Sequence, residues 1–181
     1  MLPRLMNIYL LGYMGCGKTR TGQALAACSG RSFLDLDTLF EERMQTRIPD
    51  FFNRFGEAVF REKESELMKE TAQYSRCIVA LGGGTPCFAD NMTWIRSHGY
   101  SVYLQMDAGR LAQRLQQPEE RQRPLLSGIK PEELYTHIRN HLKEREAYYL
   151  QADCTWPGGQ VSATALWEHL SLPVAAREKT E

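Results

Sequence analysis

Short hydrophobic runs alternate along the chain with longer segments in which apolar residues recur at helical spacing. The runs predict strands at residues 6–11, 32–36, 77–81, 100–106 and 154–156. The longer segments predict helices at residues 18–28, 37–46, 50–55, 57–74, 131–150 and 162–170, and two more that follow the caps Asp90 and Asp107 and end at Gly99 and Gln117. This alternation predicts a three-layer α/β/α fold with a mostly parallel five-stranded sheet.

A chain of 181 residues is long enough for one α/β domain and too short for two of ordinary size. We therefore expect one domain over residues 1–181, with a frayed polar tail at 173–181. The proline-bounded segment 116–130 has two charged clusters and no helical period, so we expect a loop or lid. In a parallel sheet of this kind, functional residues gather beyond the carboxyl ends of the strands.

The 22 basic and 22 acidic residues cancel, which leaves no overall field to attract nucleic acid or a membrane surface. No apolar run approaches the length of about 20 residues that crosses a bilayer. The apolar N-terminal run continues into a glycine cluster, so we read a strand and no signal peptide. The five scattered cysteines lack CxxC spacing, which favours reduced thiols and a cytoplasmic protein.

Residues 12–19, GYMGCGKT, match the phosphate-binding pattern G-x-x-x-x-G-K-[ST] between a predicted strand and a predicted helix. Glycines let backbone N–H groups approach phosphate oxygens, and the helix N-terminus adds positive charge. Lys18 would contact the β- and γ-phosphates, and the Thr19 hydroxyl could bind Mg²⁺. The stretch therefore predicts a nucleoside triphosphate site made of Gly12, Gly15, Cys16, Gly17, Lys18 and Thr19. Cys16 is either an inert filler of a variable position or a redox-sensitive thiol.

Two carboxylates, Asp35 and Asp37, end the second predicted strand. If the backbone stays extended, both side chains lie on one side, where one could hold a hydrated metal and the other could deprotonate an attacking hydroxyl. The alternative is that Asp37 only caps the following helix.

Three further features could build an acceptor site. Arg61 and Glu64 are three residues apart on a predicted helix, so Glu64 could fix a carboxylate-binding guanidinium; the alternative is a solvated surface pair. The run Gly82, Gly83 and Gly84 is either a close approach of backbone to ligand or a tight turn. Arg121 and Arg123 in the lid segment could reach the transferring phosphoryl group, or form a solvated charge run.

In this order, the motifs GYMGCGKT, FLDLD, GEAVFREKE, ALGGGT, RPLL and KEREAYY resemble those of the shikimate kinases, small P-loop kinases of the nucleoside-monophosphate-kinase type. The resemblance covers residue 6 to about residue 170. It implies ATP-dependent phosphorylation of the 3-hydroxyl of shikimate, in chorismate and aromatic amino acid biosynthesis. It also implies a P-loop kinase domain with a substrate-binding region at about 35–64 and a lid at about 116–130.

The resemblance implies a role for each candidate. Asp35 and Thr19 would hold Mg²⁺, and Asp37 would bind substrate hydroxyls and act as the base. The carboxylate would be clamped by Arg61, supported by Glu64, and by Arg145. The remaining residues would serve the substrate (Phe52, Phe60, Gly82, Gly83 and Gly84) or the nucleotide (Arg20, Arg114, Arg123 of the lid, and Gln160). Residues 154–160 depart from the family's usual adenine-contacting loop, so the preference for ATP over GTP is implied by resemblance alone.

Two alternatives remain open from the residues. One is another small-molecule kinase of the same build, acting on gluconate or on a nucleoside monophosphate; the acidic pair argues against the nucleotide acceptor. The other is a nucleotide-dependent switch without an acceptor, which would not need a second anion site. We expect a monomer, on the family pattern and the lack of an apolar seam.

Overall fold

The computed structural model describes residues 5–117, 126, 128–159 and 162–172. Its sheet has five parallel strands, as the sequence predicts, and their order is β2-β3-β1-β4-β5. Their bounds are β1 Asn7–Leu11, β2 Ser32–Asp35, β3 Cys77–Ala80, β4 Gly99–Gln105 and β5 Cys154–Pro157. The central strand β1 is buried along its whole length, which explains its unbroken apolar sequence. The connection that leaves β1 runs toward β2, whereas those that leave its neighbours β3 and β4 run the opposite way across the sheet, so a ligand crevice is expected at the carboxyl end of β1.

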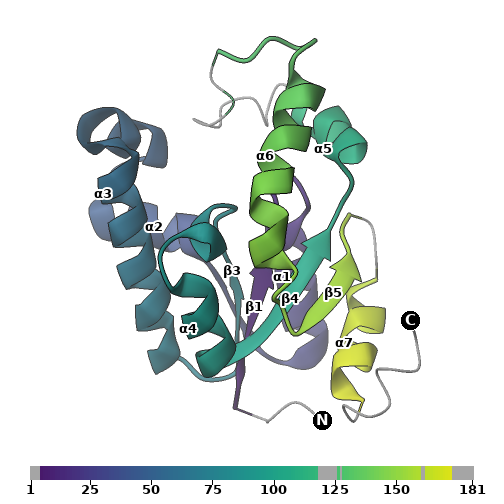
Figure 1. Cartoon of the computed structure of the whole chain (residues 1–181). Coiled ribbons are helices and arrows are strands. Elements are labelled where there is room, and N and C mark those ends of the chain that lie inside the picture. Colours follow the sequence, from purple (N-terminus) through teal and green to yellow (C-terminus); the bar gives the residue numbers. More distant parts are fainter. Residues whose placement is uncertain (1–4, 118–125, 127, 160–161, 173–181) are drawn as a thin grey trace.

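Helices cover both faces of the sheet (Figure 1). Helices α1 and α7, which pack together, lie on one face, and α4 and α6 lie on the other. The helices are α1 Lys18–Ser29, α2 Leu36–Met44, α3 Ile48–Glu70, α4 Asn91–His98, α5 Ala108–Leu115, α6 Leu134–Tyr149 and α7 Ala163–Ser171, with short 3-10 turns η1 Thr71–Gln73 and η2 Thr85–Cys87. The three-layer α/β/α prediction is therefore confirmed.

Helix α3 joins two segments that the sequence predicts as separate helices. Gly56 lies within it at φ 80°, a backbone conformation that favours glycine, and kinks the helix there. The helix ends at Glu70, earlier than predicted, and continues as the turn η1. The kink sets the direction of the half that carries Arg61 and Glu64.

One predicted helix start is wrong, and one predicted N-cap lacks its side-chain hydrogen bond. Helix α6 begins at Leu134, so Pro131 lies in the turn before it and not in its first turn. Asp90 occupies the N-cap position of α4, but its carboxylate makes no capping bond and pairs instead with Lys69 on α3, at 3.1 Å. The predicted cap Asp107 is confirmed, since its side chain accepts a hydrogen bond from the Arg110 N–H.

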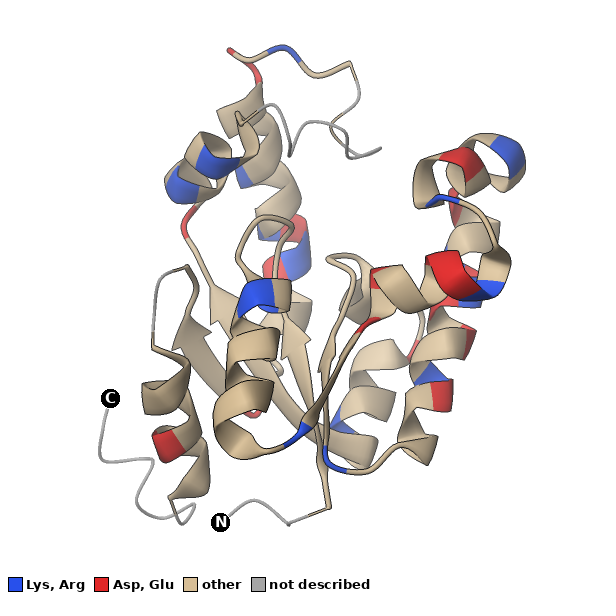
Figure 2. Ribbon diagram, turned by 180° about the vertical axis from the view of Figure 1, so that it is seen from behind, with Lys and Arg blue, Asp and Glu red and all other residues tan. Residues whose placement is uncertain are grey.

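Charged residues of both signs are spread over the helices, whereas the strands carry none except Asp35 at the end of β2 (Figure 2). Within the described part of the chain, no helix combines the length and the hydrophobicity needed to span a bilayer. The single-domain boundaries remain a prediction.

Candidate active site

The phosphate loop connects β1 to α1 and has the backbone geometry that its glycines permit. Gly12, Gly15 and Gly17 have φ values of 137°, 81° and 97°. A Cβ at Gly12 would lie 2.7 Å from the Leu104 carbonyl oxygen, so a side chain has no room there. Helix α1 follows with no side-chain cap, which leaves its first N–H groups for an anion.

The Lys18 side chain folds back over this loop. Its Nζ donates to the carbonyl oxygens of Gly12 at 2.8 Å and Tyr13 at 3.1 Å, and lies 3.8 Å from Cys16 Sγ. These hydrogen bonds hold the ammonium group against the backbone of the phosphate loop. Cys16 is completely buried.

Asp35 has a local structural role that the sequence did not predict. Strand β2 ends at Asp35 and α2 begins at Leu36, so Asp35 and Asp37 do not share one face of an extended strand. Asp35 is the N-cap of α2, accepting from the N–H of Asp37 at 3.0 Å, so the alternative that Asp37 caps the helix is also wrong. Its other carboxylate oxygen accepts from the Thr19 hydroxyl at 2.7 Å. The two predicted metal ligands are therefore in contact.

A cavity of about 290 Å³ opens where the phosphate loop, α2 and the loop after β3 meet. The predicted site residues that line it are Gly15, Gly17, Lys18, Thr19, Arg20, Asp35, Asp37, Gly82, Gly83 and Arg114. Met14, which the sequence did not single out, lines it too. The structure thus brings the predicted phosphate site and the acidic pair together at one sheet edge.

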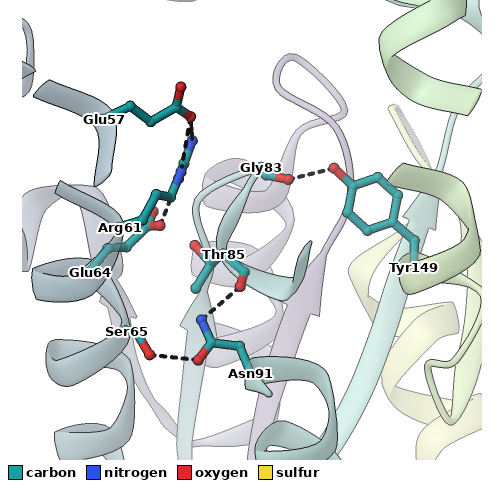
Figure 3. Close-up of polar contacts among 8 residues, drawn as sticks. All are labelled: Glu57, Arg61, Glu64, Ser65, Gly83, Thr85, Asn91 and Tyr149. Carbon is teal, nitrogen blue, oxygen red and sulfur yellow. Dashed lines mark hydrogen bonds and ion pairs between the residues drawn. The ribbon is translucent and has the colours of Figure 1, made fainter. Parts of the chain in front are cut away.

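Arg61 and Glu64 form a buried ion pair, so the surface-pair alternative is wrong. Arg61 is 8% exposed and Glu64 is 2% exposed, with 2.7 Å between Arg61 Nη1 and Glu64 Oε2. Glu57 accepts from the same guanidinium at 3.4 Å (Figure 3). Burial alone would lower the pKa of Arg61, but the charges and hydrogen bonds of Glu64 and Glu57 outweigh it and raise the pKa. The guanidinium is therefore a fixed positive charge.

The glycine loop, residues 82–84, is packed against these charged groups. A Cβ at Gly84 would lie 2.5 Å from Arg61 Nη2, and one at Gly82 would collide with Glu64 Oε1. None of the three glycines has a positive φ, so space and not backbone conformation requires glycine here. The run does form a tight turn, in which the Thr85 N–H donates to the Gly82 carbonyl at 3.2 Å, and a close approach of its backbone to a ligand stays a prediction.

Arg145 projects inward from α6, whereas Arg139 and Lys143 on the same helix are exposed. It is 9% exposed, and within the part of the chain that is described its buried Nη1 has no hydrogen-bond partner. A Cβ added to Gly83 would lie 3.7 Å from that nitrogen. A buried guanidinium N–H without a partner is costly unless an anion completes it.

The remaining predicted residues fall into two groups. Phe52 and Phe60 pack together with ring centroids 4.4 Å apart, but neither lines the cavity, so their contact with substrate stays a prediction. Arg114 has a buried Nη1 without a partner among the described residues, close to Gly17. Arg123 and Gln160, and most of the lid, lie outside the described residues.

Sequence reasoning missed two contacts of α6 with the site. The Tyr13 hydroxyl is hydrogen-bonded to His141 Nδ1 at 2.9 Å, and the Tyr149 hydroxyl donates to the Gly83 carbonyl at 2.5 Å. Burial and the nearby charge of Arg145 lower the pKa of His141 to about 4, so the ring is neutral at pH 7. The available signal was spacing, because residues 141, 145 and 149 share one helix face.

Removing the carboxylate that holds Arg61 is expected to destabilise the fold. In Glu64→Gln the buried guanidinium loses its closest counter-charge, and since Glu57 remains we expect a loss of about 3 kcal/mol in the free energy of unfolding. Urea denaturation measures it. Glu66→Gln, which breaks the exposed pair with Lys63 on the same helix, should leave the stability nearly unchanged. Equal losses in both variants would contradict the buried pair.

The similarity to known proteins can now be set beside this geometry. A sequence model described as shikimate kinase matches residues 14–167. The shikimate kinase of Parabacteroides distasonis is 38% identical over 152 residues, 84% of this chain and 87% of that protein.

Two solved structures agree in fold. The shikimate kinase from Bacteroides thetaiotaomicron has a TM-score of 0.87 and 35% identity, covering 93% of this chain and 99% of that one. The shikimate kinase from Acinetobacter baumannii in complex with shikimate has a TM-score of 0.83 and 32% identity, covering 98% and 96%. On sequence, fold and site geometry, the chain belongs to the shikimate kinase family.

Proposed function

We propose that the protein transfers the γ-phosphoryl group of ATP to the 3-hydroxyl of shikimate, forming shikimate 3-phosphate on the route to chorismate. One observation carries the proposal: an acid and two arginines meet at the glycine loop. A Cβ added to Gly82 would lie 3.3 Å from Asp37 Oδ1, one added to Gly83 would lie 3.7 Å from Arg145 Nη1, and one added to Gly84 would lie 2.5 Å from Arg61 Nη2.

This arrangement matches the chemistry of a carboxylated triol. Arg61 and Arg145 would hold the carboxylate, since guanidinium groups bind it in a bidentate manner. Asp37 would accept hydrogen bonds from hydroxyls and take the proton of the one that attacks. Phe52 and Phe60 would form the apolar wall under the ring.

On the nucleotide side, the N–H groups of the phosphate loop and Lys18 would bind the phosphates and neutralise the charge that develops on transfer. Arg114 would lie near adenine, with Arg20 at the cavity edge. Arg123 and Gln160 remain candidates from the sequence alone. The cation-binding part of the site fits Mg²⁺, because Thr19 and Asp35 offer two adjacent oxygens and Mg²⁺ keeps waters and phosphates as its other ligands. When bound, the ion would neutralise phosphate charge.

Both halves of the site come from one chain, which supports action as a monomer. All five cysteines are free thiols, which supports a reducing compartment such as the cytoplasm.

A coupled assay of ADP release tests the proposal directly. With ATP and Mg²⁺, ADP release should depend on shikimate and should not be stimulated by gluconate or a nucleoside monophosphate. Stimulation by gluconate would point to the related kinase, and equal hydrolysis without any acceptor would point to a nucleotide-dependent switch.

A further inference from the structure

Side chains from two helices hold the loop after β3 by hydrogen bonds, and a third helix holds one of these side chains (Figure 3). From α6, the Tyr149 hydroxyl donates to the Gly83 carbonyl at 2.5 Å. From the start of α4, Asn91 Nδ2 donates to the Thr85 carbonyl at 2.8 Å. Ser65 on α3 donates to Asn91 Oδ1 at 2.6 Å. One chain of contacts therefore connects α3, α4, the loop and α6.

The two contacts of Asn91 are buried, and the contact of Tyr149 with Gly83 is partly buried. Asn91 and Tyr149 are completely buried, and Ser65 is 7% exposed. Asn91 uses its amide nitrogen toward the loop and its amide oxygen toward α3, so it fixes the separation of the two elements. Buried polar groups whose hydrogen bonds are satisfied make a site rigid and unique in geometry.

The connection is in register with the two substrate arginines. Ser65 follows Arg61 by four residues on α3, and Tyr149 follows Arg145 by four residues on α6. Residues four apart share a helix face, so each arginine moves together with the hydrogen-bonding residue one turn further along its helix. Each arginine also lies against a glycine of the same loop. Both guanidinium groups therefore lie against the same loop, and the position of the loop sets the distance between them.

We propose that Ser65, Asn91 and Tyr149 are positioning residues that set the separation of Arg61 and Arg145 for a carboxylate ligand. The inference rests on the proposed function, because it assigns both arginines to the acceptor. A displacement of about 1 Å in such a clamp can cost about 100-fold in catalytic efficiency, so small shifts of the loop would be visible in acceptor kinetics.

Tyr149→Phe and Ser65→Ala each delete one hydroxyl and keep the rest of the side chain. Each should raise KM for shikimate about ten-fold, as expected for a shift of a few tenths of an ångström. KM for ATP should stay unchanged, because within the described part of the chain the two hydroxyls donate to Asn91 and Gly83 and not to the phosphate loop. Steady-state kinetics with each substrate varied in turn measures both.

Tyr9→Phe and Ser101→Ala are matched controls away from the loop. Tyr9 loses a buried hydroxyl contact with Thr71 at 3.0 Å. Ser101 loses two partly buried hydrogen bonds with Asp153, one donated to Oδ2 at 2.6 Å and one accepted from the N–H at 3.0 Å. Thermal unfolding should show similar destabilisation in each matched pair, with KM for shikimate unchanged in the controls.

Three outcomes would overturn the inference. If KM for shikimate is unchanged in both test variants while the wild type is active, positioning fails and the proposed function stands. If the controls raise KM as much, the effect is a general loss of stability. If the wild type shows no shikimate-dependent ADP release, the proposed function fails and the inference falls with it.

Discussion

Replacing Asp37 by Asn is expected to lower kcat with shikimate by about 10³-fold, the usual contribution of a positioned general base. The variant keeps the size of the side chain and removes its capacity to take a proton. Asp37 lines the cavity, and its backbone N–H is held by the Asp35 carboxylate at 3.0 Å, so its position is fixed by the start of α2. Initial-rate measurements at saturating ATP and shikimate give the effect on kcat.

Asp50→Asn is the control for this substitution. Asp50 lies in the first turn of α3 as Asp37 lies in the first turn of α2, so both changes remove an acid near a helix N-terminus. Only the Asp37 variant should lose turnover. A small effect at Asp37, with KM for ATP and thermal stability unchanged, would show that another group accepts the proton.

The strands and the phosphate loop could be predicted from sequence because their signals are local. Each buried strand is a short apolar run, and the pattern of residues 12–19 specifies a backbone conformation through its glycines. The edge of the sheet at which the candidate site residues gather could also be predicted, because the carboxyl ends of parallel strands meet there. Gly56 was predicted to interrupt a helix, and the structure turns that interruption into a kink.

What could not be predicted depends on contacts between distant elements. The pair Arg61 and Glu64 has the spacing of a surface ion pair, and only its packing against the glycine loop buries it. Asp35 takes the cap of α2 because the strand ends one residue earlier than its apolar pattern indicates. Asn91 is hydrogen-bonded to residues on α3 and in the loop, and no local sequence pattern predicts these two contacts.

The spacing of Arg145 and Tyr149 shows the intermediate case. Four residues apart, they were certain to share a face of a helix, but the sequence did not say that this face meets the Gly83 carbonyl. Periodicity gives a residue its direction, whereas the partner in that direction comes from the tertiary packing.

Lys18→Met should also lower kcat by about 10³-fold, because a preorganised cation on the transferring phosphoryl group is lost. Methionine keeps an apolar stem of similar shape, so the substitution isolates the charge. The Nζ is already oriented by the carbonyl oxygens of Gly12 and Tyr13, at 2.8 and 3.1 Å, so little reorganisation precedes its contact with phosphate.

The comparison of kcat with ATP affinity decides what Lys18 does. Charge builds up on the phosphoryl oxygens during transfer, so kcat should fall by a larger factor than the Kd for ATP rises. Lys63→Met removes an exposed lysine that pairs with Glu66 on α3, and it should change neither quantity. Isothermal titration with ATP and initial rates on both variants measure the two factors. Equal factors at Lys18 would mean that the lysine binds the nucleotide without favouring the transition state, and the phosphate loop would then owe its catalytic effect to its backbone N–H groups.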